Sequence, residues 1–135
     1  MTASMLRLAS LERACAALPS TWMVVQWHGV HVWKVGSEGD GRSKMFAVLS
    51  PEGHRGDAVD GVPSSTVTLK VREERLPFLT DLPRISRAPH LPRGGWLQFG
   101  AGVPFDDEDM AAYLADSHAI VAATPPKHVR ASLGL

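Results

Sequence analysis

One segment of the chain combines a regular series of basic side chains with a complete lack of acids. It covers residues 82–105, and its cations recur every three residues as Arg84, Arg87, His90 and Arg93. After Asp116 the chain again contains no acid, and the basic residues Lys127 and Arg130 follow. If this loop and the C-terminus are close in space, a chain with no net charge still has one positive face. Cations on such a face neutralise phosphates and position a DNA duplex without reading its sequence.

A second group of cations lies near two predicted strands. Lys34 stands in the stretch HVWKV, and Arg42 and Lys44 stand on either side of the start of KMFAVLS. These side chains could form a wing beside the first group, so that both contact double-stranded DNA. The other reading is that all of them are ordinary solvated charges on a soluble domain.

The histidines and the single cysteine do not form a metal-ligand pattern. His28 and His31 are close in sequence, but no carboxylate or cysteine stands near them to complete a coordination shell. Polar packing at a strand end explains both imidazoles. Cys15 falls on the apolar stripe of a predicted helix, where a free thiol behaves as a small hydrophobe. The sequence therefore predicts neither a metal nor a cofactor.

Motifs of known catalytic sites are absent from the sequence. There is no G-x-S-x-G elbow, no H-E-x-x-H and no glycine-rich loop ending in Lys-Ser or Lys-Thr. The glycines at positions 36, 39 and 41 precede a predicted strand, so they lack the helix N-terminus that binds phosphate in nucleotide sites. These absences indicate a non-enzymatic protein.

Length and composition indicate one domain over residues 1–135. The chain is 44% hydrophobic, and its 14 basic residues balance its 14 acidic residues. A net charge of zero removes the simplest argument for nucleic-acid binding, which is a strongly basic whole. No apolar run approaches the roughly 20 residues of a membrane span, and no secretory signal is visible. We expect a cytoplasmic protein without a membrane partner, and favour a monomer.

Hydrophobic periodicity predicts a helix, a block of strands and a closing helix. Apolar residues at helical spacing cover residues 3–18. A short helix interrupted at Pro77 covers 72–81, and this proline would fit the first turn of a helix better than its middle. Residues 83–95 hold too many prolines and glycines for a helix. The closing helix follows Asp106, whose side chain can cap it, and a further helical turn covers 127–133. The predicted strands are 21–28, 31–35, 44–50, 66–71 and 96–99, with 44–50 paired to 66–71 across a polar loop. Strands in a block between helices favour an α+β fold.

Several short motifs, taken in order, make the chain resemble the MmcQ/YjbR family of small bacterial proteins. They are ALP (17–19), WHG (27–29), KVG (34–36), KMFAVL (44–49), TLKV (68–71), RAPHL (87–91) and SHAIVAATPPK (117–127). The resemblance implies a CyaY-like fold, which is a two-layer sandwich with the N- and C-terminal helices packed on one face of an antiparallel sheet. It also implies a DNA-binding role with a double-wing arrangement. Frataxin shares this fold and handles iron with acids on its first helix, but that helix here contains only Glu12.

The four tryptophans support an alternative function. Trp22, Trp27, Trp33 and Trp96 all fall in predicted strands, and we expect two or three of them in the core. A tryptophan exposed on the sheet could stack on a base or line a ligand pocket. The alternative is therefore a small-molecule or protein-interaction module that uses the aromatic face of the sheet.

Overall fold

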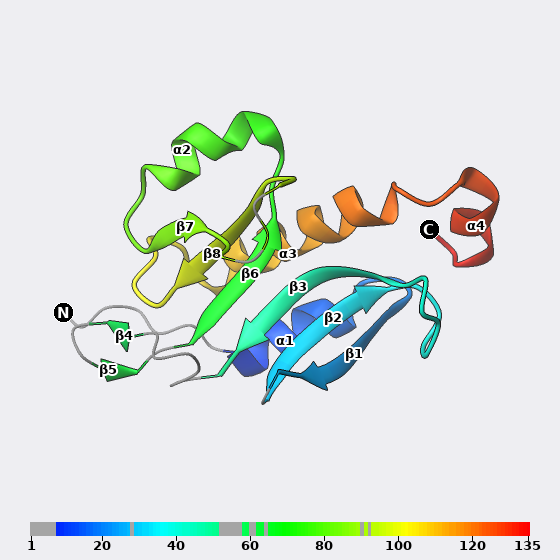
Figure 1. Ribbon diagram of the computed structural model, residues 1–135, viewed down its shortest axis with the longest axis horizontal. Coiled ribbons are helices and arrows are strands. Elements are labelled where there is room, and N and C mark those ends of the chain that lie inside the picture. The colour runs from blue at the N-terminus through cyan, green and yellow to red at the C-terminus, as the bar shows by residue number, and fades with distance from the viewer. Residues whose placement is uncertain are drawn as a thin grey trace.

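The fold is described from a computed structural model, which defines residues 8–27, 29–51, 58–59, 62–63, 65–89, 91 and 93–135. Its helical elements are α1 (Leu8–Ala16), η2 (Glu73–Arg75), α2 (Leu76–Thr80), α3 (Asp107–Ala122) and α4 (Lys127–Ser132). Its strands are β1 (Thr21–Gln26), β2 (Val30–Val35), β3 (Lys44–Ser50), β4 (Ala58–Val59), β5 (Val62–Pro63), β6 (Thr66–Lys70), β7 (Ile85–Arg87) and β8 (Trp96–Gly100). Figure 1 shows their arrangement.

Six strands form one antiparallel sheet in the order β1-β2-β3-β6-β8-β7. β3 and β6 pair as the sequence predicted, with Ala47 opposite Leu69. β4 and β5 pair with each other in a separate two-stranded ribbon within the loop that joins β3 to β6. A register shift between β2 and β3 places both Phe46 and Ala47 in the main core, because the bulge interrupts the usual alternation of side chains.

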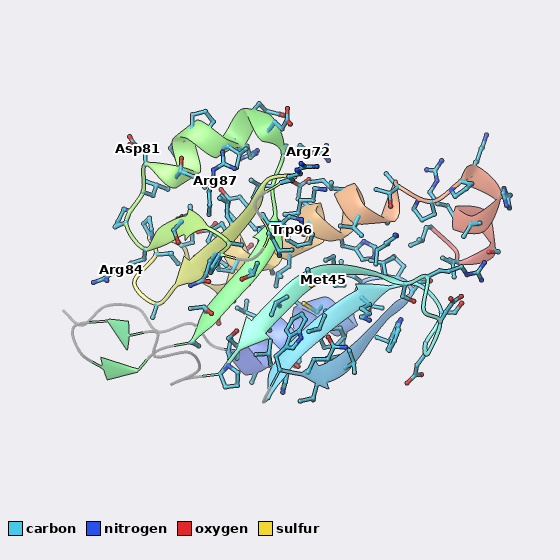
Figure 2. The ribbon with its side chains drawn as sticks, viewed as in Figure 1. Met45, Arg72, Asp81, Arg84, Arg87 and Trp96 are labelled. Carbon is cyan, nitrogen blue, oxygen red and sulfur yellow. The ribbon has the colours of Figure 1, made fainter. Side chains whose placement is uncertain are left out.

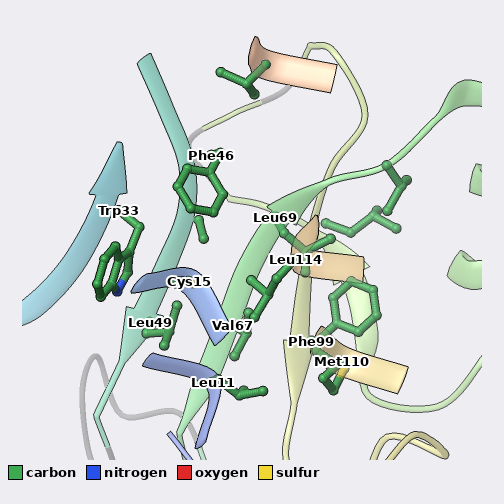
Figure 3. Close-up of a cluster of buried hydrophobic side chains, with 14 of the residues drawn as sticks. Leu11, Cys15, Trp33, Phe46, Leu49, Val67, Leu69, Phe99, Met110 and Leu114 are labelled. Carbon is green, nitrogen blue, oxygen red and sulfur yellow. The ribbon is translucent and has the colours of Figure 1, made fainter. Parts of the chain in front are cut away.

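α1 and α3 contact each other and cover the same face of the sheet (Figure 1). Each helix buries one apolar side, with Leu11 and Cys15 from α1 and Met110 and Leu114 from α3. These side chains meet the strands in one continuous core (Figure 3). The α+β fold with helices on one face of an antiparallel sheet is therefore confirmed.

α3 begins at a capping box, which explains the acidic cluster seen in the sequence. The side chain of Asp106 accepts a hydrogen bond from the backbone N–H of Asp109 at 2.8 Å, and the Asp109 carboxylate accepts one from the Asp106 N–H at 3.3 Å. Both bonds satisfy amides that the helix itself leaves free, and the negative charges oppose the positive end of the helix dipole. The cluster therefore starts a helix.

The structure differs from the sequence predictions in a few places. Within the breaker-rich segment 83–95, residues 85–87 form β7, because the neighbouring strand β8 supplies its hydrogen bonds. Trp27 lies in the turn after β1, with a positive φ of 48°, and its side chain is 54% exposed. Only Trp33 of the four tryptophans is buried, where two or three were expected. Residues 3–7 of the predicted first helix lie outside the described residues. No helix in the described parts of the chain is both long and apolar enough to cross a membrane.

Candidate nucleic-acid interface

The face of the sheet turned away from α1 and α3 is called the outer face below. Side chains alternate between the faces of a strand, so the residues that flank core residues point to the outer face. Lys34 lies between the core residues Trp33 and Val35, and Lys70 lies between Leu69 and Val71. The outer face also carries its own small apolar cluster of Val30, Val32 and Val48, against which Val24 and Met45 pack.

Trp22 and Lys34 form the first aromatic and cationic pair on this face. They are register partners on β1 and β2, and the Lys34 Nζ lies 5.3 Å from the centroid of the Trp22 ring. The Trp22 Nε1 donates a hydrogen bond to the Oγ of Ser43 at 3.1 Å, so the indole has a fixed orientation. Both residues are half-buried.

Lys70 and Trp96 form a second pair of the same kind on β6 and β8. They are also register partners, and the Lys70 Nζ lies 5.8 Å from the Trp96 ring centroid. Lys70 lies against Gly94, where an added Cβ would come within 3.1 Å of the ammonium. Gly94 has a φ of +84°, a conformation that side-chain-bearing residues rarely adopt. The glycine therefore gives the Lys70 side chain the space it occupies beside Trp96.

The two pairs lie on the outer face, one on either side of β3. Lys34 is the register partner of Met45 on β3, whereas the pairing of β3 with β6 ends at Ala47 and Leu69, one residue before Lys70. We call Trp22, Lys34, Met45, Lys70 and Trp96 the Trp–Lys row; Figure 2 labels Met45 and Trp96. On each side of Met45, the lysine stands on the strand nearer to β3, which is β2 or β6. The tryptophan stands on the next strand out, which is β1 or β8.

α3 holds the sheet together beneath this row, where β3 and β6 stop pairing. The Oγ of Ser117 donates to the carbonyl oxygen of Phe46 at 2.6 Å and accepts from the backbone N–H of Lys70 at 2.9 Å. The hydroxyl thus bridges a carbonyl and an amide that would otherwise be unpaired. Lys70 owes its position in the row partly to this bridge.

Charge is separated between the sheet and the rest of the fold. The six strands of the sheet contain no Asp or Glu, whereas they carry Lys34, Lys44, Lys70 and Arg87. Every acidic residue in the described part of the chain lies in a helix or a loop. Among the described residues, neither Lys34 nor Lys70 forms an ion pair with a carboxylate.

The predicted wing residues gather at the end of the sheet where the β2–β3 loop lies. Arg42 is bound to Asp40, with its Nη2 2.9 Å from Oδ2. The side-chain hydrogen bond from Arg42, followed by its backbone hydrogen bond, lowers the pKa of Asp40 and keeps that carboxylate ionised. Lys44 is exposed at the first position of β3. Because Asp40 offsets the charge of Arg42, Lys34 and Lys44 are the effective cations of this group.

The C-terminal cations adjoin this end of the sheet. Arg42 and Lys44 line a hollow of about 540 Å³ whose other wall comes from the end of α3 and from α4, including Val121, Pro125 and Val129. Lys127 is exposed on α4 and Arg130 is half-buried there. The structure thus brings the wing and the C-terminal group to one region.

The basic loop does not join that region, contrary to the arrangement that would give one positive face. Arg84 and Arg87 lie toward one end of the long axis of the molecule and α4 lies at the other (Figure 2). Arg84, Arg87 and Arg93 are exposed, and His90 lies outside the described residues. Arg87 is the register partner of Leu97, a core residue, so it points away from the outer face. β7 forms the sheet edge opposite β1, which separates these cations from the wing.

A polar group on the helix side of the sheet explains one of the candidate metal ligands. The Oε1 of Glu12 accepts a hydrogen bond from the Nε1 of Trp33 and lies 3.1 Å from the Nδ1 of His31. His31 therefore contacts α1 as a packing residue. Within the described residues, no three His, Cys, Asp or Glu side chains come together as a possible metal site. His28 is not among the described residues.

A second hollow lies between η2 and α3, with a volume of about 750 Å³. Its lining includes Phe105 and Tyr113, together with the ion pair of Arg72 and Asp116 at 3.1 Å. No tryptophan lines either hollow. An apolar pocket around the tryptophans would favour the small-molecule alternative, and neither hollow is of that kind.

Comparison with known proteins gives a family and a fold. A family model described as YjbR matches residues 16–120. The crystal structure of Deinococcus radiodurans protein DR2400, described as a DUF419 domain, has a TM-score of 0.75 at 23% identity and covers 97% of this chain and 90% of its own. The crystal structure of a Pseudomonas syringae protein, the structural genomics target PsR293, has a TM-score of 0.64 at 19% identity and covers 87% and 99%. No curated protein matches the chain.

The sequence did not indicate the Trp–Lys row, although its members were visible. Lys70 is not among the site residues predicted from the sequence, and the sequence alone does not assign Trp27 and Trp33 to a face of the sheet. Polar and apolar residues alternate strictly in TVTLKV. This alternation predicts that Lys70 points to the opposite face of β6 from Leu69 and Val71. The row as a whole cannot be predicted without the strand order, because β6 pairs with β8 across 25 intervening residues.

Proposed function

We propose, from the premise that the chain belongs to the YjbR family, that it is a non-enzymatic protein that binds DNA. Phosphates bind to the lysines of the outer face, chiefly Lys34 and Lys70. Lys44 and the adjoining β2–β3 loop extend this contact at the end of the sheet.

The separation of charge carries this proposal. A molecule with zero net charge has little long-range attraction for DNA, so binding needs a surface from which acids are absent. The outer face supplies such a surface, since Lys34 and Lys70 point to it and the strands of the sheet hold no carboxylate. The acidic first turn of α3 belongs to the helix layer, so it is kept away from the outer face.

Lys34 and Lys70 suit phosphate contact better than the paired cations do. Each ammonium rests beside an indole ring instead of a carboxylate, so no ion pair has to break before a phosphate binds. Arg42 and Arg72 are instead bound to Asp40 and Asp116. A phosphate would compete with those carboxylates for the guanidinium groups.

The proposal is tested by measuring DNA affinity at several salt concentrations, by fluorescence anisotropy of a labelled oligonucleotide. The logarithm of the affinity should fall with the logarithm of the salt concentration, with a slope of about −0.9 for each phosphate contact. The double variant Lys34→Gln/Lys70→Gln should bind more weakly and reduce the size of that slope by about two.

The matched control is the triple variant Arg84→Gln/Arg87→Gln/Arg93→Gln. It removes more positive charge than the double variant, so a general effect of net charge would weaken binding more. We expect it to weaken binding less. A larger effect of the triple variant would place the contact at the β7 end, and no binding by the wild type at low salt would refute the function.

A further inference from the structure

We infer that the form of DNA bound at the outer face is single-stranded, with bases stacked on Trp22 and Trp96; this inference rests on the proposed function. The Trp–Lys row is the feature in which chemistry and geometry point to one ligand.

The row combines the two contacts that single strands need. Indole rings stack on any base, because every base has a π-face, and ammonium groups bind the phosphates between them. Each tryptophan here has a lysine beside it, at 5.3 Å for Trp22 and 5.8 Å for Trp96. Each ammonium lies over its ring, so a base that stacks there displaces the ammonium, which can then bind the phosphate of the same nucleotide.

The spacing of the row suits an extended strand. Trp22 on β1 and Trp96 on β8 are separated by β2, β3 and β6. With neighbouring strands about 4.8 Å apart, the two indoles are about 19 Å apart across the sheet, and farther where β3 and β6 separate. That distance is long enough for several nucleotides of one strand. Met45 in the middle offers an apolar surface to the bases between the two rings.

The rings are also held in place before a ligand binds. The hydrogen bond from Trp22 Nε1 to Ser43 fixes one indole, and the packing of Trp96 against the main core restrains the other. A preformed aromatic surface loses little conformational entropy on binding. Trp27, which is 54% exposed in a turn, lacks this support.

A duplex cannot use the row in the same way. The faces of its bases are covered by their neighbours, and its major groove, about 12 Å wide, admits a helix or a narrow ribbon. The row is half-buried on the face of a six-stranded sheet, and a sheet of that width does not enter a groove. Its side chains therefore cannot reach the base edges. A duplex on this face would touch the lysines alone and leave the indoles unused.

The experiment compares a labelled 20-nucleotide thymidine strand with a 20-base-pair duplex by anisotropy at one salt concentration. We expect the single strand to bind at least tenfold more tightly and to quench tryptophan fluorescence. Trp22→Leu/Trp96→Leu should lose roughly tenfold in affinity for the single strand per indole removed, with duplex affinity unchanged. Trp22→Phe/Trp96→Phe should recover part of the loss because it restores aromatic rings.

Trp27→Leu is the matched control, since it removes an exposed tryptophan outside the row and should leave both affinities unchanged. Circular dichroism checks that each variant is folded, and quenching in the wild type reports stacking without any substitution. Equal or tighter binding of the duplex, or a single strand that binds without quenching, would overturn this inference and leave the proposed function standing. No binding of either DNA would overturn both.

Discussion

Cys15 shows how the position of one residue decides its chemistry. The thiol is fully buried on the core side of α1. This burial, together with the nearby Glu12 carboxylate, raises the pKa of Cys15 to about 12. A nucleophilic cysteine needs the opposite setting, in which an accessible and positive environment lowers the pKa. Cys15 is therefore a packing residue, as its place on the apolar stripe predicted.

The raised pKa gives a testable pH dependence. A pKa above the unfolded value of 9.0 means that the folded state favours the protonated thiol. This contribution to stability is fully present below pH 9 and is lost as the pH rises toward 12. We expect the folded protein to resist alkylation at pH 8, whereas the urea-unfolded protein reacts readily.

The control for this prediction is Cys15→Ala. Between pH 9 and 12 its free energy of unfolding, measured by urea titration, should fall less steeply than that of the wild type. Rapid alkylation of the folded wild type at pH 8 would show that the thiol is accessible and contradict its burial.

Trp22 and Trp96 illustrate a second point at the residue scale. Both occupy strands, and both are held in place by the fold, yet neither is fully buried. Complete burial of the rings would serve stability better, since each apolar Å² removed from water is worth about 25 cal/mol. Their partial exposure beside lysines is what distinguishes them from the core residue Trp33.

At the scale of elements, Ser117 joins α3 to the two strands that separate beneath the Trp–Lys row. Replacing Ser117 with alanine would leave the carbonyl of Phe46 and the amide of Lys70 without their partner. Each unpaired buried group costs about 1–3 kcal/mol, so we expect Ser117→Ala to lower the free energy of unfolding by about 2 kcal/mol or more. Urea titration followed by circular dichroism measures this change.

Ser132→Ala is the corresponding control. Ser132 also donates to a backbone carbonyl, that of Val129, but it is exposed at the end of α4, where water can replace the bond. Its effect should stay within about 0.5 kcal/mol. If both substitutions had the same small effect, the Ser117 bridge would not stabilise the sheet.

The elements that follow from local patterns were predictable from the sequence, and those that depend on distant partners were not. β3 matches its predicted range of 44–50, and Pro77 stands in the first turn of α2 as predicted. β7 is only three residues long and lies among prolines and glycines, so it needs β8 to define it. The candidate site shows the same limit, because the strand order that puts Lys34 and Lys70 in one sheet is not a local property.

At the scale of the whole molecule, the fold puts the acidic residues of the described part of the chain in helices and loops, and leaves the six strands of the sheet without them. The carboxylates of α3 stabilise their own helix terminus, while the strands present only cations. The net charge is zero because the 14 basic and 14 acidic residues are summed along the whole chain. Local charge, not net charge, is therefore the property that bears on binding here.

The main core draws on elements from both ends of the chain, which predicts how the molecule unfolds. Leu11 of α1 and Leu114 of α3 meet Leu69 of β6 in one cluster, so the main core spans both halves of the sheet (Figure 3). We expect a single cooperative transition in urea, with tryptophan fluorescence and far-ultraviolet circular dichroism giving the same midpoint.

Leu69→Ala removes a fully buried side chain at the join between the halves and should lower the free energy of unfolding by about 2–5 kcal/mol. Both signals should shift together, because the substitution weakens the whole cluster. Two separate transitions, or a shift in one signal alone, would mean that the strands β1 to β3 can unfold independently of β6 to β8.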